Sequence, residues 1–476
     1  MADAPSHPAL GRELERRLYQ AHLDLRAALE RPVPVRGADE VDRTYRRPSH
    51  RPLGTVLGAV MVARLAYQAE GVNGLHPMDA SLNLPPDEFS HGVRRFVAEH
   101  AAMMSFDEVV AELHAQTGAR AAKRQAEELA VRAAIDFEAF YAGRRAANDV
   151  VERTRDLLVM TFDGKGIVMV PEDLRPATKK AASKAVRKLA TRLTTGEKRN
   201  RKRMAQVAAI YTVPRHMRTP LDVLADLDGS RADDDRPERP KVRHKRVWAS
   251  VEREPETVIE ETFREALARD PQHRRQWAVL VDGNKDQLAI ISAMAERLGP
   301  VCIIVDLMHV LEYLWRAAHA LCGEGTKEAE SWVQQRLLWL LQNRPAGKIA
   351  TAMRRSARAA NLSDGALKAV HDAADYLQDY ARYMRYGDAI QWGLPIATGV
   401  IEGACRYLVK DRMGRGGVRW TLDGAEAVLR LRALRTSGDF DAYWEMHLRE
   451  ELRRNHVARY AHASLPDPIR PLRRVK

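Results

Sequence analysis

The amino-acid sequence predicts an α/β fold in which a mixed sheet carries an all-helical insertion. Between residues 156 and 310, short runs rich in Val and Ile alternate with helical segments, which is typical of strands joined by crossover helices. Residues 327–385 are rich in Ala, Leu, Arg and Glu at helical spacing. The region before residue 150 has a mostly helical pattern, so we expect a helical N-terminal region in front of the sheet.

The composition of the chain favours a polyanionic partner. Its 476 residues include 77 Lys and Arg against 64 Asp and Glu, and the net charge of +13 favours nucleic acid or an anionic membrane surface. No segment approaches the roughly 20 consecutive apolar residues of a membrane span, and the N-terminus lacks a signal-peptide core. Three widely spaced cysteines without a CxxC pair support neither a disulfide framework nor a structural zinc site. We therefore expect a soluble, multidomain protein of the cytoplasm.

The first hundred residues form an N-terminal region. Residues 11–32 have the pattern of a charged helix, and the Pro-rich residues 31–40 break that helix and indicate a linker. Residues 55–67 are apolar with a mixed period, and we interpret them as a strand.

Residues 101–150 have the layout of a helix-turn-helix. Ser105 and Glu108 form a capping box at the start of one helix, and Gly118 marks a break. A second helix then opens with three basic residues, Arg120, Lys123 and Arg124, which could enter a major groove. An ordinary helical hairpin with a solvated basic face explains the pattern equally well.

From residue 156 the pattern changes to short apolar runs that predict buried strands. They are residues 157–162, 167–170, 207–213, 277–281 and 301–305. We expect an α/β core that begins in residues 151–325, is interrupted by a helical insertion in residues 326–390, and is completed by residues 391–440. Residues 441–476 are expected to form a C-terminal tail.

Two aspartates directly follow apolar runs. Asp163 comes after residues 157–162 and Asp282 after residues 277–281, so both are expected at strand ends, where functional groups gather in α/β sheets. Neighbouring strands lie about 4.8 Å apart, which would let the two carboxylates share a metal ion. Carboxylate oxygens suit Mg²⁺, with Mn²⁺ as the alternative.

Glu402 is the third candidate carboxylate. It lies in the first turn of a helix that Thr398 can cap, and a third ligand would allow two metal ions to bind. Arg406 and Lys410 follow at helical spacing and could grip a DNA backbone. The order of strands, helices and acidic residues matches a ribonuclease-H-like core.

The sequence also resembles a known family. The motifs TFDGKGIVMVPEDLR, GEKRNRKRMAQVAAIY, KRVWASV, VLVDGN, VDLMHVLEYLW and TGVIEGACRYLVKDRMGRGGVRW are similar to those of the ISKra group of bacterial insertion-sequence transposases, relatives of the mutator-like DDE enzymes. With LNLPPDEFSHGVRR and SFDEVVAEL upstream, they cover about residues 50–435. The resemblance implies that Asp163, Asp282 and Glu402 are the catalytic metal ligands and that the substrate is the element's terminal DNA.

Asp306 is a rival for the second ligand, because it also ends an apolar run. In mutator-like relatives an acidic residue or Cys, two further positions and a His follow the second catalytic Asp, and Asp306 with His309 resembles that motif. The pair would then support the metal site without binding the ion. A core histidine beside a capping aspartate is the other interpretation.

Aromatic and basic side chains supply candidate DNA contacts. Trp315, Trp332, Trp339 and Trp392 lie in or beside the insertion; core packing explains most of them, and Trp392 is the favoured partner for an unpaired base. The candidate phosphate contacts are Lys198, Arg199, Arg201, Lys202, Arg203, Arg412 and Arg415.

These patterns together predict a DDE transposase that cleaves element ends and joins them to target DNA. We expect a homo-oligomer, at least a dimer on double-stranded DNA, that associates with the bacterial nucleoid when bound. A nuclease or resolvase with the same core but no strand transfer is one alternative. A non-enzymatic helix-turn-helix protein is the other.

Overall fold

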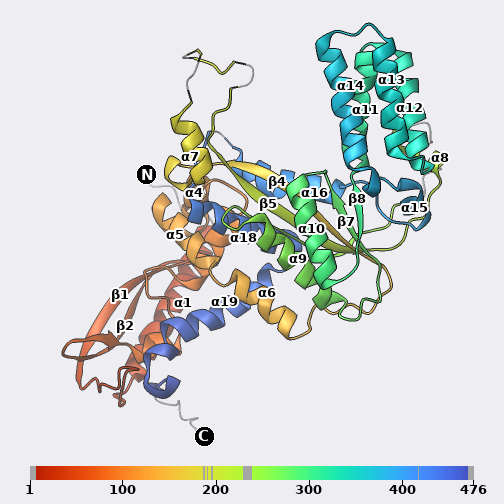
Figure 1. Ribbon diagram of the computed structural model, residues 1–476. Helices are drawn as coiled ribbons and strands as arrows, with labels where there is room; N and C mark the ends of the chain where they lie inside the picture. The colour runs from red at the N-terminus through yellow and green to blue at the C-terminus, as the bar shows by residue number, and fades with distance from the viewer. Residues whose placement is uncertain are drawn as a thin grey trace. The chain divides into compact units, whose positions relative to one another are not determined.

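The computed structural model describes residues 7–185, 188–189, 191–194, 197–228, 238–415 and 417–469. The chain divides into two compact units (Figure 1). Unit 1 combines Met1–Ala142 with Asp423–Lys476, and unit 2 is Gly143–Leu422. Within the described ranges, every helix is too short or too polar to cross a membrane.

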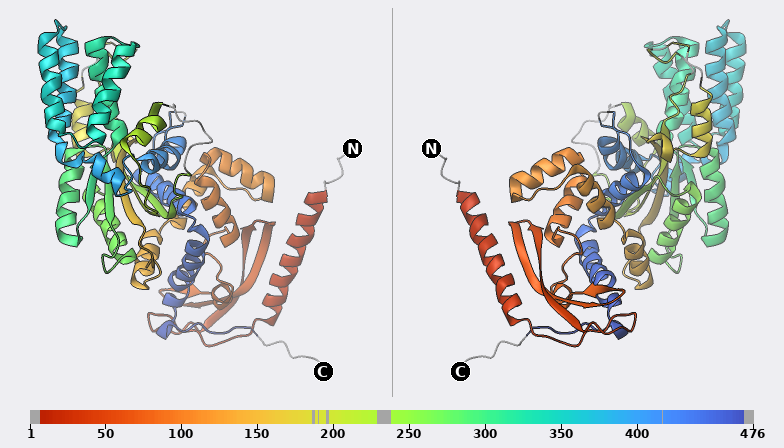
Figure 2. Two further views of the ribbon diagram at one scale, coloured as in Figure 1. Left: turned by 90° about the vertical axis from the view of Figure 1, so that its right-hand side faces the viewer. Right: turned by 90° about the vertical axis from the view of Figure 1, so that its left-hand side faces the viewer.

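Unit 1 contains a three-stranded antiparallel sheet in the order β1-β2-β3. The strands are β1 (Tyr45–Thr55), β2 (Gly58–Ala69) and β3 (Val72–Leu75). Helix α1 (His7–Leu29) packs on β2 and buries Leu23 against Leu53 and Val62 (Figure 2). The expected strand at residues 55–67 is confirmed as most of β2. Its partner β1 was not predicted, because Pro48 and Pro52 lack a backbone donor, and edge strands tolerate that loss.

Five helices follow the small sheet. They are α2 (Pro77–Ser81), α3 (His91–Ala101), α4 (Phe106–Thr117), α5 (Lys123–Ala133) and α6 (Phe137–Ala146). Helix α4 begins with the predicted capping box, and Gly118 ends it in the left-handed conformation at φ 73°. The second helix starts at Lys123, so Arg120 lies in the turn before it. Helices α3, α4 and α5 pack on one another as a three-helix group.

The C-terminal segment completes unit 1 with two long helices, α18 (Leu422–Ser437) and α19 (Phe440–Asn455). Much of the segment that we expected to be a tail is therefore helix, while residues 470–476 lie outside the described residues. Buried ion pairs anchor α19: Glu451 meets Arg94 at 2.6 Å, and Asp136 meets both His447 at 2.7 Å and Arg454 at 2.5 Å. The segment HLREELRRN is highly charged, a pattern typical of an exposed helix. In the structure Glu451 and Arg454 instead pair with residues distant in the sequence.

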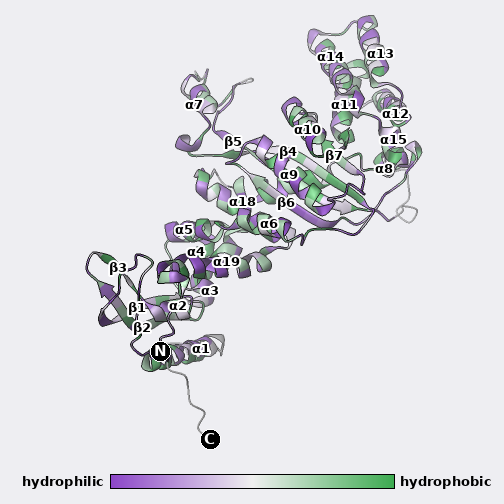
Figure 3. Ribbon diagram, turned by 60° about the horizontal axis from the view of Figure 1, so that its bottom comes forward, coloured by the Kyte–Doolittle hydropathy of each residue, from purple (hydrophilic) through white to green (hydrophobic). Residues whose placement is uncertain are grey.

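Unit 2 is built on a mixed five-stranded sheet in the order β6-β5-β4-β7-β8. Its strands are β4 (Leu157–Val168), β5 (Lys202–Val213), β6 (Arg243–Ser250), β7 (Trp277–Val281) and β8 (Cys302–Val305). The pairs β4/β5 and β5/β6 are antiparallel, whereas β4/β7 and β7/β8 are parallel. Every residue of β7 is buried, and Figure 3 shows the apolar character of this central part of the sheet.

Two predicted strands of unit 2 differ from the structure. Residues 157–162 and 167–170 were expected as separate strands, but β4 runs unbroken through Asp163 because each of its residues pairs with β5. Strand β6 was not predicted, since its first residues are exposed and basic, and only Arg246–Ser250 carry the buried pattern. The parallel strands and their crossover helix α10 (Lys285–Leu298) agree with the prediction.

Helices occupy the remainder of unit 2. Those outside the insertion are η1 (Pro171–Asp173), α7 (Pro176–Ser183), α8 (Pro220–Asp228), α9 (Pro255–Arg269), α11 (Leu307–Cys322), α16 (Gly399–Ala404), η4 (Cys405–Lys410) and α17 (Asp411–Met413). The predicted helical insertion is confirmed as α12 (Lys327–Leu341), α13 (Ala346–Ala359), α14 (Asp364–Asp379), η3 (Ala381–Tyr383) and α15 (Tyr386–Gln391). Helix α11 packs against α12 and α14, and so connects the sheet to the insertion.

Candidate metal centre

Three aspartates lie at one level of the sheet of unit 2. The parallel register ends at Thr161 opposite Leu280 in β4/β7, and at Val281 opposite Val305 in β7/β8. Asp163 and Asp282 each lie two residues beyond the first pair, and Asp306 lies one residue beyond Val305. The carboxyl ends of parallel strands thus bring the three side chains to the same edge. Asp282 and Asp306 follow strand ends, as expected, whereas Asp163 lies inside β4 opposite Val207.

Asp306 is a fully buried carboxylate with both oxygens occupied. Its Oδ1 accepts a hydrogen bond from the Met308 backbone N–H at 2.7 Å, which caps α11. Its Oδ2 accepts from the backbone N–H of Thr398 at 3.2 Å and from the Thr398 hydroxyl. Thr398 precedes α16 but makes no side-chain cap to it, contrary to our expectation, because its hydroxyl donates to Asp306 instead. Asp306 therefore joins the start of α11 to the start of α16.

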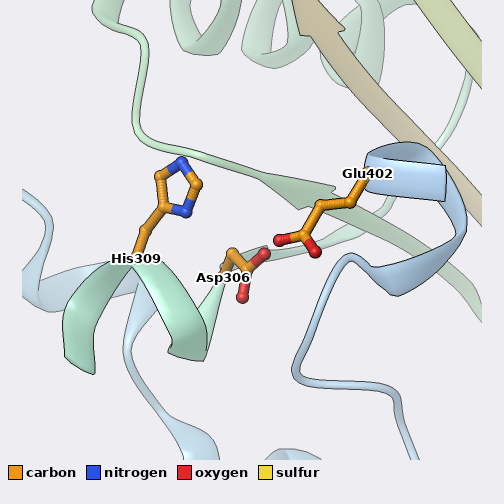
Figure 4. A group of neighbouring side chains, drawn as sticks. All are labelled: Asp306, His309 and Glu402. Carbon is orange, nitrogen blue, oxygen red and sulfur yellow. The ribbon is translucent and has the colours of Figure 1, made fainter. Parts of the chain in front are cut away.

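Glu402 lies beside Asp306 and His309 (Figure 4). One ligand atom from each of these three residues lies within 4.8 Å of the others, which is the spacing of a candidate metal site. Asp306 is buried, His309 is half-buried and Glu402 is exposed. The His309 Nδ1 atom is buried and has no hydrogen-bond partner among the described residues, as expected for a nitrogen that faces an ion. Two carboxylates and an imidazole suit a divalent transition metal as well as a harder ion.

Asp163 and Asp282 do not belong to that group of three. The Asp163 Oδ1 accepts a hydrogen bond from the Gly164 N–H at 2.6 Å, and its Oδ2 accepts from the Cys405 thiol at 3.0 Å. The Asp282 Oδ1 accepts from the Asn284 N–H at 3.0 Å, while its Oδ2 has no hydrogen-bond partner in the described part of the chain. Asp282 therefore has an oxygen available to a ligand, whereas both oxygens of Asp163 accept hydrogen bonds.

Cys405 is a site residue that the sequence did not reveal. Burial raises the pKa of its thiol, and the charges of Asp163 and Asp282 raise it further, so the thiol stays protonated and donates to Asp163. It lies three residues after Glu402, where α16 continues into the π-helical turn η4. A π-helical turn changes the number of residues per turn, and such turns are frequent at functional sites. The expectation that Arg406 and Lys410 share a face with Glu402 assumed α-helical spacing, which ends at Cys405.

Tyr376 connects the helical insertion to the sheet edge. Its hydroxyl, on α14, donates to the Asp282 backbone carbonyl at 2.8 Å, and burial raises its pKa well above the usual range. Gly283 follows Asp282 with φ 94°, and a Cβ at this position would lie 2.8 Å from the Tyr376 hydroxyl oxygen. The turn after β7 thus requires glycine.

A pocket of about 730 Å³ opens beside the candidate metal centre. Glu402 forms part of its wall, and α8, α11 and α12 supply the remainder, including Leu311, Trp315 and His319. Of the tryptophans that we considered as partners for an unpaired base, Trp315 lines this pocket. Trp392 is 50% exposed but is not part of the lining. Trp332 and Trp339 stack with Arg336 along α12.

The basic residues predicted to contact DNA differ in their surroundings. Six in unit 2 are exposed: Lys198, Arg199, Lys202, Arg406, Lys410 and Arg415. Arg201 is half-buried. Arg203 donates to the carbonyls of Val251 and Glu252, and Arg412 is buried with its guanidinium 4.7 Å above the Trp420 ring. Arg203 and Arg412 are thus occupied within the fold.

The basic residues of the three-helix group in unit 1 are exposed. Arg120 lies in the turn, Lys123 pairs with Asp107 at 2.6 Å, and Arg124 pairs with Glu128 at 3.0 Å. Exposed ion pairs of this kind are weak and can exchange for phosphate contacts.

No protein-family model matches the chain, and no curated protein matches it.

Proposed function

We propose that the protein is a DDE transposase of the ISKra type with a ribonuclease-H-like core. The observation that carries the proposal is the placement of Asp163, Asp282 and Asp306 at one level of a mixed sheet, beside the helix of Glu402. Three antiparallel strands followed by two parallel ones, in the order β6-β5-β4-β7-β8, support the proposed core. The net charge of +13 supports a DNA substrate.

We assign Asp163, Asp282 and Glu402 as the metal ligands of the reaction. Asp282 has an Oδ2 atom without a hydrogen-bond partner among the described residues, which favours it over Asp306 as the second ligand. Both oxygens of Asp163 also accept hydrogen bonds, and its assignment follows its family-like motif and its place at the same level of the sheet. In this assignment Asp306 and His309 lie beside Glu402 and support its position without binding the ion. Divalent ions bound there, Mg²⁺ or Mn²⁺, would activate water and neutralise charge at the scissile phosphate.

The proposed chemistry is two successive phosphoryl transfers. In the first, a water oxygen attacks a phosphorus at the element end, the bond to the 3′ oxygen breaks, and a free 3′-hydroxyl results. In the second, that hydroxyl attacks a phosphorus of target DNA and displaces another 3′ oxygen. The carboxylates would hold the divalent ions, which would bind the oxygens of the reacting phosphate, and no covalent bond to the protein forms.

Two further features fit this proposal. The pocket that contains Trp315 and Glu402 combines an aromatic ring and apolar side chains with polar and acidic groups, so it could receive an unpaired base next to the cleaved phosphate. The helices α4 and α5, with their exposed basic turn, fit recognition of duplex DNA by unit 1. We propose that two or more copies act together on the two ends of one element.

The test is cleavage and joining of DNA that flanks the gene, with Mg²⁺ or Mn²⁺. Asp163→Asn, Asp282→Asn and Glu402→Gln are each expected to abolish cleavage, while binding of the DNA ends survives. Asp306→Asn is expected to retain measurable cleavage, with metal affinity lowered about 10–100-fold. If Asp282→Asn cleaves normally and Asp306→Asn does not, the second ligand is Asp306.

Joining distinguishes the proposal from its nearest alternative. A precut end with a free 3′-hydroxyl should be joined to a second DNA by a transposase. A nuclease or resolvase with the same core would cleave but leave that precut end unjoined. If the wild type binds the DNA but neither cleaves nor joins it, the protein is a DNA-binding protein without catalysis.

A further inference from the structure

A second pocket of unit 2, with a volume of about 450 Å³, lies at the far end of strands β4 and β5. Ala182 of α7 forms part of its wall, and α7 marks this end of the strands in Figure 1. Its floor is apolar and includes the buried side chains of Met169 and Leu174. Four arginines complete the lining: Arg192, Arg199, Arg201 and Arg419.

The backbone around Met169 holds two of these arginines in place. The Met169 N–H donates to the Arg201 carbonyl at 3.0 Å, and Met169 forms a parallel bridge with Trp420. Trp420 also donates to the Val168 carbonyl at 3.0 Å and is 4% exposed. Arg201 and Arg419 are far apart in the sequence, yet the main chain fixes them on opposite sides of one residue. Both arginines therefore reach the pocket from segments that are hydrogen-bonded to the end of β4.

The positive charge of the pocket is uncompensated. In the described part of the chain, none of its four arginines forms an ion pair, and no acidic side chain belongs to the lining. Arg203 provides the contrast, because its guanidinium donates to the carbonyls of Val251, Glu252 and Asp173 and stays outside the lining. Arg203 thus has a structural role, whereas the guanidinium groups of the pocket arginines remain able to bind an external anion.

We propose that this pocket binds the sugar–phosphate backbone of double-stranded DNA. The planar forks of Arg201 and Arg419 match phosphate oxygens two at a time, and Arg192 and Arg199 add charge at the rim. The apolar floor receives the adjoining deoxyribose. The inference rests on the proposed function only in taking DNA as the polyanion, and it adds an anchoring site separate from the metal centre.

The experiment measures equilibrium binding of the full-length protein to a labelled mixed-sequence duplex over a range of salt concentrations, with EDTA present. The double variant Arg201→Ala with Arg419→Ala is compared with Arg355→Ala with Arg358→Ala, two exposed arginines of α13. Both variants lose the same charge. The pocket variant should bind roughly tenfold or more weakly, and its plot of log K against log salt should be shallower by about two. The α13 variant should match the wild type.

Two further measurements distinguish the phosphates of duplex DNA from free phosphate as the anion that the pocket binds. Arg201→Lys with Arg419→Lys should recover the salt slope because the charges remain. Inorganic phosphate, added at constant ionic strength, should compete only weakly with duplex. Equal losses in both double variants, or full displacement of the duplex by inorganic phosphate, would overturn the proposal. Because EDTA removes the metal, a failure of cleavage in the earlier test does not affect this result.

Discussion

At the scale of single residues, the candidate metal centre is defined by what each oxygen or nitrogen already contacts. Asp306 has both carboxylate oxygens bonded, and its role is to join α11 to α16. His309 has a buried nitrogen without a partner in the described chain. The Cys405 thiol donates a hydrogen bond to Asp163 and so limits how that carboxylate can turn.

The first prediction concerns His309. Manganese should raise the melting temperature of the full-length protein, because an ion that binds only the folded state stabilises it. His309→Ala should lower the manganese affinity about 10–100-fold and so lose part of that rise, since the imidazole lies beside Glu402 and supports its position. At a metal concentration about 100 times Kd, the wild type should gain about 2.7 kcal/mol.

The matched control is His319→Ala, on the same helix α11 but outside the group of three. It should keep the full manganese effect. An unchanged effect in His309→Ala would remove the imidazole from the metal centre and leave it as a structural residue.

At the scale of elements, the turn after β7 couples the sheet to the helical insertion. Gly283 adopts φ 94° there, and the Tyr376 hydroxyl from α14 leaves no room for a Cβ. This crowding places Asp282 at a fixed distance from the insertion. The position of Asp282 therefore depends on helix α14, which is not part of the sheet.

The second prediction follows from that crowding. Gly283→Ala should lower the free energy of unfolding by about 1–3 kcal/mol, because alanine is strained at this φ and meets the Tyr376 hydroxyl. In the double variant with Tyr376→Phe, the 2.8 Å contact disappears while ring carbons remain at 3.1 and 3.3 Å, so part of the loss should return. Urea unfolding of the two single variants and the double variant measures the coupling. Purely additive losses would show that the hydroxyl does not cause the strain.

At the scale of the whole molecule, both ends of the chain build unit 1 while the middle builds unit 2. The C-terminal helix α19 supplies buried partners for charges near the N-terminus, including Glu451 for Arg94 and His447 for Asp136. Removing one partner of a buried ion pair is strongly destabilising. Unit 1 is therefore incomplete without the end of the chain.

The third prediction concerns removal of the C-terminal helices α18 and α19. A chain that ends at Leu422 should lose the folded state of unit 1 and its DNA binding, because Asp136 loses its partners His447 and Arg454 and Arg94 keeps only Asp87. Unit 2 of the same chain should still bind manganese. A chain that ends at Ala463 keeps α19 and should behave like the wild type in both assays. Protease resistance of unit 1 after the larger truncation would contradict the prediction and support a dispensable tail.

Much of the fold could be predicted because its signals are local. The parallel strands β7 and β8, the crossover helix between them and the helices of the insertion follow from apolar runs and helical spacing. Strand β6 and edge strand β1 escaped prediction, since charged and proline residues mask their pattern. Helix α19 escaped because its charges find partners more than 300 residues away.

For the candidate site, the sequence by itself determined which carboxylates are candidate ligands, since an acidic residue directly after an apolar run is a local pattern of the sequence. It placed Asp282 and Asp306 at strand ends and Glu402 on a helix. Only the tertiary structure decided that Glu402 lies with Asp306 and His309, that Cys405 donates to Asp163, and that Arg201 and Arg419 line one pocket. These contacts depend on sheet register and on a π-helical turn, and both are set by packing between segments distant in the chain.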